Sequence, residues 1–213
     1  MLLATSGFVL TLSFIAPTLS VLQCVAQALR FRTSGAQGVS LDTWILSAFV
    51  TELWTGYGLI YHVPAEIYAN IPFLIVAGIV VAVAARRQHA VRRAVVGALI
   101  ITIITLLVSL AGLSPHWRWI LATLSDVSAV TMYLPQMVVA LRSSNLEGVS
   151  VVSWALATLT GLAWALYGVL IHQPPVALPS VVMVPSALVI LIQVSRHRLR
   201  GRALRGVLAP IVE

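Results

Sequence analysis

Seven long apolar segments divide this 213-residue sequence, and each is long enough to cross a lipid bilayer. Hydrophobic residues make up 60% of the chain and charged residues only 9%, which is more apolar surface than a soluble domain of this size can bury. A spanning helix needs about 20 apolar residues, and backbone groups in lipid must satisfy one another within the segment. We therefore predict an all-α polytopic membrane protein with seven transmembrane helices. The predicted spans are residues 7–29, 41–61, 65–85, 94–113, 119–141, 150–171 and 175–195.

The arginines are distributed unequally between the two sides of this predicted bundle. All 13 basic residues are arginines, and the formal net charge is +7. When the connecting loops are assigned to alternate sides, one side receives every arginine except Arg118. The positive-inside rule places the arginine-rich side in the cytoplasm, so we expect the N-terminus outside and the C-terminus inside. Arginines between apolar runs do not form a nucleic-acid patch, and no nucleic-acid partner is expected.

The last residues, 196–213, form a basic tail that we interpret as an anchor for this orientation. Binding of this tail to lipid headgroups or to a partner is the alternative. The complete absence of lysine is typical of a GC-rich bacterial genome, so the bacterial plasma membrane is the expected location.

An internal repeat with an offset of 110 residues is the second constraint. The stretch WTGYGLIYHVP begins at Trp54 and returns as WALYGVLIHQP beginning at Trp164. Two tryptophan pairs in one register are hard to obtain from composition alone, so the chain contains a repeated unit. The further matches are Arg32 with Arg142, Ser34 with Ser144, Gly38-Val39-Ser40 with Gly148-Val149-Ser150, Trp44 with Trp154, Tyr57-Gly58 with Tyr167-Gly168, His62 with His172 and Pro64 with Pro174.

The repeated unit contains three predicted helices, so a direct fusion would turn the second copy upside down. The fourth helix restores the orientation, which predicts two parallel three-helix bundles joined by a linker helix. Transporters built from parallel repeats bind their solute near mid-membrane at the repeat interface. We divide the chain into a first repeat (1–86), a linker helix (87–116), a second repeat (117–195) and the basic tail (196–213).

The second copy also carries a short motif at the end of its first helix. Tyr133-Leu134-Pro135-Gln136 is followed by Arg142, a polar loop, Gly-Val-Ser and the W-x-x-Y-G pattern. This combination resembles the PQ-loop superfamily, and the three-one-three layout is similar to its SWEET sugar transporters, whose half-size bacterial relatives are the SemiSWEETs. At the matching position the first copy has Val25-Ala26 instead.

The resemblance implies a solute transporter that works by alternating access, and no Walker motif is present to supply ATP energy. The superfamily includes sugar carriers, proton-coupled amino-acid exporters and a sorting receptor. We expect facilitative movement of a mono- or disaccharide. A proton-coupled amino-acid carrier and a non-transporting receptor or sorting protein are the alternatives. The expected partners are a small solute and the bilayer, and a homo-oligomer is left open.

The resemblance also implies which residues line the solute pocket. In SWEET-like carriers these are tryptophans and an asparagine of each third helix, sixteen residues after the tryptophan in the SemiSWEET-like spacing. Tryptophan planes stack on the C–H faces of sugar rings, and an amide can bond hydroxyl groups. An interfacial aromatic belt is the competing interpretation of the tryptophans and tyrosines. The substrate-binding candidates are Trp54, Tyr57, Asn70, Trp164, Tyr167 and Ser180.

Prolines and acids within the spans supply further candidates. Pro17 and Pro135 would kink the first and fifth helices, so these two residues and Gln136 are predicted to form a hinge for gating. Asp126 and Glu52 are ionisable residues in apolar segments, where such groups are costly and often functional. Either acid could couple transport to protons or simply pack with a hydrogen bond.

Other classes of membrane protein fit the sequence less well. A retinal protein needs a lysine for its Schiff base, and there is none. A membrane enzyme needs a nucleophile–base set or a metal cluster, but Cys24 is the single cysteine and no H-E-x-x-H or G-x-S-x-G pattern occurs. We therefore expect no enzymatic activity, no cofactor and no metal site.

Overall fold

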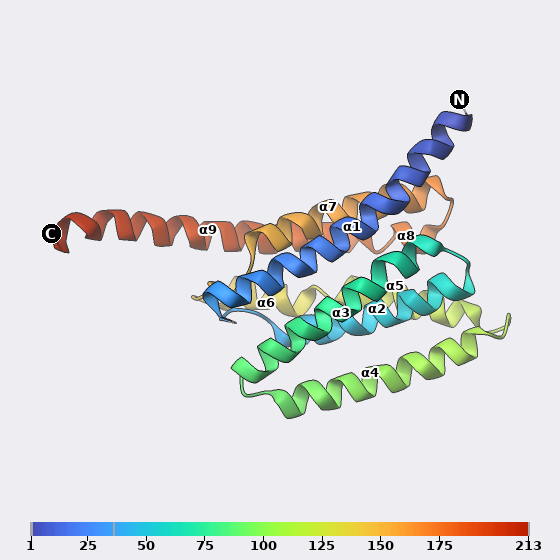
Figure 1. Ribbon diagram of the computed structural model, residues 1–213, viewed down its shortest axis with the longest axis horizontal. Coiled ribbons are helices and arrows are strands. Elements are labelled where there is room, and N and C mark those ends of the chain that lie inside the picture. Colours follow the sequence, from blue (N-terminus) through green and yellow to red (C-terminus); the bar gives the residue numbers. More distant parts are fainter. Residues whose placement is uncertain (1, 36, 213) are drawn as a thin grey trace.

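The computed structural model describes the backbone of residues 2–35 and 37–212 and the side chains of residues 7–31, 33–35 and 37–200. Over these residues the chain is all-α and forms seven helical rods packed side by side (Figure 1), as predicted. Two rods are each broken into two helices, α5 with α6 and α8 with α9. The helices are α1 (Leu2–Ser34), α2 (Leu41–Ile60), α3 (Pro64–Arg87), α4 (Val91–Gly112), α5 (Arg118–Thr131), α6 (Leu134–Arg142), α7 (Val151–Leu170), α8 (Pro174–Ala177) and α9 (Ser180–Val212).

Six of the seven rods are both long enough and apolar enough to cross a membrane, which makes the chain an integral membrane protein. The exception is α2, which has a spanning length of 20 residues but carries Asp42 and Glu52. Its surroundings explain this polarity, because α2 packs against α3, α4 and α5 and more than half of its residues are buried. A helix enclosed by other helices faces protein instead of lipid, so a purely apolar surface is not required of it.

The two repeats are packed against each other in a reciprocal way. Within each repeat the third rod contacts the other two: α3 packs on α1 and α2, and α9 packs on α6 and α7. Between the repeats, α1 lies along α7, while α2 lies along α5 and α6 (Figure 1). The first rod of each repeat therefore packs on the second rod of the other, as expected for two copies related by an approximate twofold axis.

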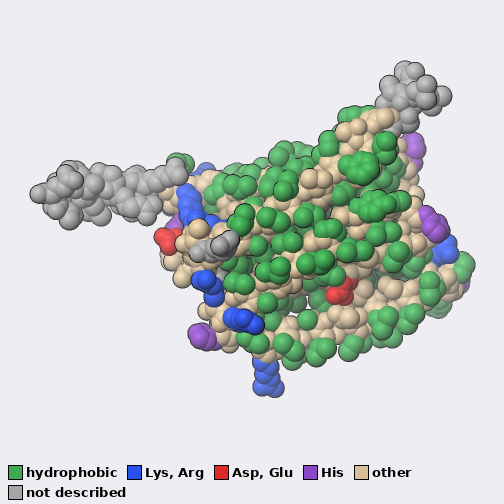
Figure 2. Space-filling model, in the orientation of Figure 1, with side chains coloured by type: hydrophobic (Ala, Val, Ile, Leu, Met, Phe, Trp, Pro, Cys, Tyr) green, Lys and Arg blue, Asp and Glu red, His purple; other side chains and the backbone are tan. Residues whose placement is uncertain are grey.

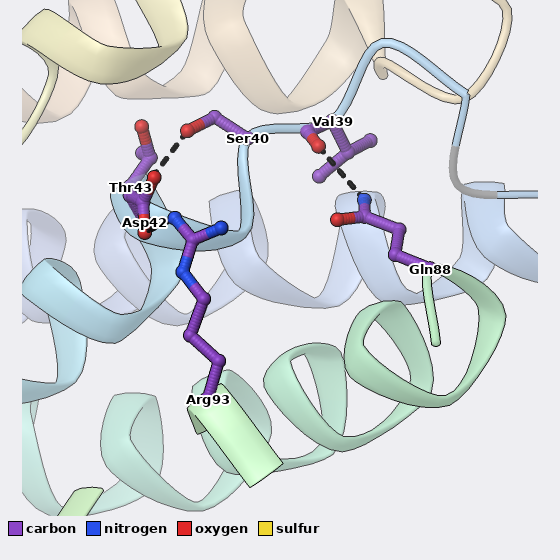
Figure 3. A network of polar contacts seen from close by, with 6 residues as sticks. All are labelled: Val39, Ser40, Asp42, Thr43, Gln88 and Arg93. Atoms are coloured by element: carbon purple, nitrogen blue, oxygen red, sulfur yellow. Dashed lines mark hydrogen bonds and ion pairs between the residues drawn. The ribbon is translucent and has the colours of Figure 1, made fainter. Parts of the chain in front are cut away.

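The linker helix α4 lies at the edge of the bundle, against α2, α3 and α5 (Figure 1). Most of its apolar side chains are exposed, as expected for a helix surrounded by lipid. One end of α4 is fixed by an ion pair between Arg93 and Asp42 near the start of α2 (Figure 3). Next to this pair, Gln88 Nε2 donates a hydrogen bond of 2.9 Å to the carbonyl of Val39.

The repeated Gly-Val-Ser sequence begins the second helix of each repeat. The hydroxyl of Ser40 accepts a hydrogen bond from the Thr43 amide at 3.2 Å (Figure 3), and Ser150 accepts one from the Ser153 amide at 3.1 Å. A serine in this N-cap position satisfies an amide that the helix itself leaves unpaired. The repeated serine is thus explained by helix capping.

The repeated histidine ends the same helices. His62 and His172 have positive φ angles of 56° and 54°, in the left-handed region that terminates helices. After each histidine the chain closes a bond back to the helix, from the Val63 amide to the Gly58 carbonyl and from the Gln173 amide to the Gly168 carbonyl. Histidine tolerates this conformation better than most residues do. The pair therefore has a structural reason to recur.

The distribution of side chains on the surface agrees with a membrane-embedded bundle. Apolar side chains cover the long faces of the rods, and most arginines gather at one end (Figure 2). We call this the arginine-rich end. Helix α9 continues without interruption from Ser180 to Val212. The side chains of Arg32, Arg202 and Arg205, which contribute to the predicted asymmetry, lie outside the described ones.

Candidate functional site

A cavity of about 90 Å³ lies between the two repeats, lined by residues from α1, α2, α3, α5, α7, α8 and α9. Most of its lining residues are related by the repeat offset of 110, so the cavity surrounds the approximate twofold axis. The related pairs are Gln23 and Tyr133, Val50 and Thr160, Thr51 and Gly161, Trp54 and Trp164, Glu66 and Val176, Ala69 and Pro179, Asn70 and Ser180, and Phe73 and Met183.

Both predicted tryptophans line this cavity. Trp54 is 7% exposed, while Trp164 is half-buried and its indole Nε1 donates a hydrogen bond of 3.2 Å to the hydroxyl of Ser20. Tyr57 and Tyr167 are outside the lining and contact the two tryptophans edge-on, with ring centroids 5.0 Å and 5.8 Å apart. The tyrosines thus pack against the tryptophan rings from outside the cavity lining.

Tyr57 also connects the two repeats at the end opposite the arginines. Its hydroxyl is 3.2 Å from Oε1 of Gln173, to which it donates a hydrogen bond, and its ring stacks on Tyr61 with centroids 4.4 Å apart. Gln173 is the residue that precedes α8. At this end a side-chain hydrogen bond therefore joins the first repeat to the second.

Asn70 lies in the cavity wall and is bonded to an acid that the sequence analysis missed. Its Nδ2 donates to the carbonyl oxygen of Glu66 at 2.7 Å and to the carboxylate Oε2 of Glu66 at 3.0 Å. Glu66 is only 5% exposed and lines the cavity. Glu66 and Asn70 are four positions apart, which places them on one helix face. This spacing was the signal in the sequence that could have identified Glu66.

Ser180, the counterpart of Asn70, lines the other side of the cavity at the start of α9. It follows a break at Leu178 and Pro179, after the short helix α8. A glycine permits this arrangement, because a Cβ at Gly168 would lie 2.6 Å from the amide nitrogen of Ala177. In the first repeat a Cβ at Gly58 would lie 2.9 Å from the Cβ of Glu66. The repeated Tyr-Gly therefore permits close helix crossings in both halves.

Gln136 of the PQ motif is 1% exposed and holds the first turn of α2. Its Oε1 accepts from the Ser40 amide at 2.7 Å, and its Nε2 donates to the Gly38 carbonyl at 2.9 Å. The sequence-predicted hinge residue is thus a contact between the repeats. We call this pair of bonds a glutamine clamp.

A second glutamine clamp, which the sequence analysis also missed, is made by Gln27. Its Oε1 accepts from the Ser150 amide at 3.0 Å, and its Nε2 donates to the Gly148 carbonyl at 2.8 Å. Gln27 and Gln136 are 109 residues apart, so an alignment at 110 pairs Gln136 with Ala26. The stretch from Gln136 to Ser150 is one residue longer than the stretch from Gln27 to Ser40, which accounts for the difference.

The two predicted hinge prolines occupy different structures. Pro17 lies inside the continuous helix α1, whereas Pro135 stands in the first turn of α6 after the break at Met132 and Tyr133. Gln23 Nε2 donates a hydrogen bond of 3.2 Å to the Tyr133 hydroxyl across the repeat interface, and both residues line the cavity. A break in the helical rod is therefore present at one of the two positions.

The two acids predicted from sequence are outside the cavity lining. Glu52 faces α4 and accepts a hydrogen bond from Thr102 at 3.3 Å. Asp126 is half-buried, and its Oδ1 has no hydrogen-bond partner in the described part of the chain. Among the described residues, no three His, Cys, Asp or Glu side chains come together as metal ligands would.

The fold has a counterpart among solved structures. A eukaryotic SWEET transporter superimposes with a TM-score of 0.63 and 15% sequence identity, covering 88% of this chain and 97% of that one. No family model and no curated protein matches the sequence. At this identity the match defines the architecture: the chain has the SWEET transporter fold, which confirms the resemblance drawn from the PQ motif and the repeat.

Proposed function

We propose that this chain is a facilitative transporter that moves a small sugar across a bacterial plasma membrane by alternating access. The cavity on the repeat axis carries the proposal, because eight of its residue pairs are supplied symmetrically by the two halves. Two tryptophans offer flat apolar faces to a sugar ring, and Asn70, Ser180 and Thr51 offer hydrogen bonds to hydroxyls. A site shared equally by two repeats is the arrangement expected of a carrier whose repeats rock against each other.

The size of the cavity favours a monosaccharide over a disaccharide. The cavity has a volume of about 90 Å³, which corresponds to on the order of six water molecules. A hexose has more heavy atoms than that, so a monosaccharide would need the repeats to separate slightly before it could bind. A disaccharide would require the two repeats to separate further before it could bind.

Contacts between the repeats on both sides of the cavity support alternating access. The glutamine clamps of Gln27 and Gln136 lie at the arginine-rich end, and the Tyr57–Gln173 bond lies at the other end. Opening toward either side would break one set and keep the other. With the arginine-rich end in the cytoplasm, the Tyr57–Gln173 contact would face the outside, as would the N-terminus.

The test is counterflow into proteoliposomes that contain the purified full chain and are preloaded with unlabelled sugar. We expect saturable uptake of labelled glucose without a pH gradient, and its loss in Trp54→Ala and Trp164→Ala. Leu99→Ala, on the lipid-facing surface of α4, serves as the matched control and should leave uptake unchanged. Uptake that survives both tryptophan changes would contradict the assignment of the cavity as the solute site.

A proton-coupled amino-acid carrier is the second candidate, and the buried Oδ1 of Asp126 without a partner is the observation that favours it. In that case uptake of amino acids should follow an imposed pH gradient and fail in Asp126→Asn. Glu52→Asn would test the other acid in the same assay. Absence of flux for every sugar and amino acid would favour a receptor or sorting role.

A further inference from the structure

One corner of the cavity presents only hydrogen-bond acceptors. Asn70 uses its Nδ2 for two bonds to Glu66, so its Oδ1 is the atom left for a solute. In the described part of the chain, Oε1 of Glu66 has no hydrogen-bond partner. An ionised carboxylate has acceptor capacity and no donor. This corner therefore suits a solute group that donates several hydrogen bonds.

The cavity lining contains no group that would neutralise Glu66. No arginine, lysine or histidine is among the described residues of the lining. The negative charge of Glu66 is offset in part by the N-terminus of α3, because Glu66 lies in its first turn and a helix N-terminus carries roughly half a positive charge. A carboxylate that is 95% buried with so little compensation is costly unless a cation joins it.

A helix-terminal acid by itself would be ordinary, and such acids usually point into water. Glu66 differs because it is enclosed and lines the same cavity as Trp54 and Asn70. Gly58 allows this placement, because α2 can approach the Cβ of Glu66 closely only where α2 has no side chain. The repeat counterpart of Glu66 is Val176, so the charge is present on one side of the axis only.

The acid shares one cavity with the proposed sugar-stacking tryptophans. Glu66 is four residues from Asn70, or about 6 Å along α3, toward the end opposite the arginines, and both line the cavity together with Trp54 and Trp164. A ring stacked between Trp54 and Trp164 would thus have a substituent within reach of the carboxylate. A neutral hydroxyl would bind weakly at that position, whereas an ammonium group would form an ion pair with the Glu66 carboxylate.

We propose that Glu66, with Oδ1 of Asn70, binds the ammonium group of the solute, so that the cavity selects an amino sugar over a neutral sugar. This inference rests on the proposed function, because it uses the same cavity, and it narrows the solute class. Hydrogen bonds to charged groups contribute about 1.5–3 kcal/mol, which corresponds to a preference of roughly tenfold to a hundredfold.

The experiment compares labelled glucosamine with glucose and with N-acetylglucosamine, which keeps the nitrogen but not its charge. Counterflow is measured with the purified full chain and with Glu66→Gln. The control variant is Glu147→Gln, the same chemical change at an exposed acid outside the cavity lining. We expect the parent and Glu147→Gln to take up glucosamine about tenfold faster at equal low concentration than either neutral sugar. Glu66→Gln should lose this preference, so that its uptake of glucosamine falls to the rate of the two neutral sugars.

Three results would overturn the proposal. The first is equal uptake of the three sugars by the parent chain. The second is a preference for glucosamine that Glu66→Gln retains. The third is glucose uptake that depends on a pH gradient in the parent but not in Glu66→Gln, which would make Glu66 a proton site.

Failure of transport can be separated from failure of this inference by a binding measurement. A change in tryptophan fluorescence in detergent reports binding of the solute to the chain without requiring flux. If nothing is transported but glucosamine quenches the parent and not Glu66→Gln, the ammonium site stands and the transport proposal fails. If glucose is transported but glucosamine neither moves nor quenches, the transport proposal stands and the ammonium site is wrong.

Discussion

The two repeats have the same three-rod layout but achieve it with different local structures. In the first repeat α1 and α3 are continuous, although Pro17 and Pro72 lie inside them. In the second repeat both corresponding rods are broken, at Met132–Tyr133 and at Leu178–Pro179. Yet each first rod supplies a glutamine clamp to the other half. The comparison teaches that the clamp belongs to the shared fold, whereas the break belongs to the second repeat alone.

The largest expected effect comes from removing the clamps. Gln27→Leu and Gln136→Leu should each lower the free energy of unfolding by about 2–4 kcal/mol, because each leaves a buried amide and a backbone carbonyl without the side chain that they bond. Unfolding would be followed by titrating a denaturing detergent into micelles of the folded protein. Gln37→Leu, at an exposed position, is the control. A small effect for Gln27 beside a large one for Gln136 would show that the halves are not equivalent.

Substituting the glycines at the close helix crossings should distinguish the two repeats more clearly. A Cβ at Gly168 meets backbone at 2.6 Å, while one at Gly58 meets mainly side-chain atoms. Gly168→Ala should therefore cost about 1–3 kcal/mol, and Gly58→Ala less, because side chains adjust more easily than backbone. The same unfolding titration measures both. Gly78→Ala is the control, since nothing lies within 4 Å of its added Cβ. Equal losses at Gly58 and Gly168 would count against this reading of the crossings.

Replacing a proline should change the transport rate in the second repeat and the stability in the first. Pro135 follows a break, so Pro135→Ala should lengthen the helix, stiffen the rod and slow counterflow several-fold. Pro17 lies in a continuous helix, and Pro17→Ala should restore a helical hydrogen bond and raise the free energy of unfolding with little change in flux. Initial rates of counterflow and the unfolding titration would be measured on both variants. A flux defect in Pro17→Ala alone would place the moving joint in the first repeat.

The smallest effect is expected at Ser180, the counterpart of Asn70. Asn70 orients Glu66 through its amide, so Asn70→Ser should weaken binding of the solute by about tenfold, the value of a lost hydrogen bond to a charged group. Ser180→Asn would make the second repeat resemble the first and should change KM by less than about twofold, because no acid adjoins Ser180 among the lining residues. The concentration dependence of uptake distinguishes the two outcomes.

The fold was predictable from the sequence because lipid imposes strong rules. Spans such as 41–61 and 94–113 agree closely with α2 and α4, since a helix must satisfy its own backbone in the bilayer. The repeat register also predicted that Trp54 and Trp164 would be equivalent, and both line the cavity. Glu66 and Gln27 escaped prediction. Their significance depends on which residues face them from the other helices, and sequence spacing within one helix does not contain that information.

The breaks of the rods were also beyond the sequence. Prolines occur in α1, α3, α6 and α9, but their positions alone do not tell which helix tolerates a kink and which separates into two. Packing decides this, as at Pro179, where α7 and α8 touch through Gly168. The roles of Pro17, Pro135 and the pocket residues remain predictions for the experiments above.

The reciprocal clamps have a consequence for how the chain is made. Synthesis proceeds from the N-terminus, so α1 and α2 enter the membrane long before residue 136 exists. Until then the amide of Ser40 lacks its partner, and Gln27 has no helix to hold. A polypeptide that stops before α6 would present both unsatisfied groups to the cell's quality-control proteases. The arrangement thus makes completion of translation a condition for a closed first half, and truncated products should be short-lived.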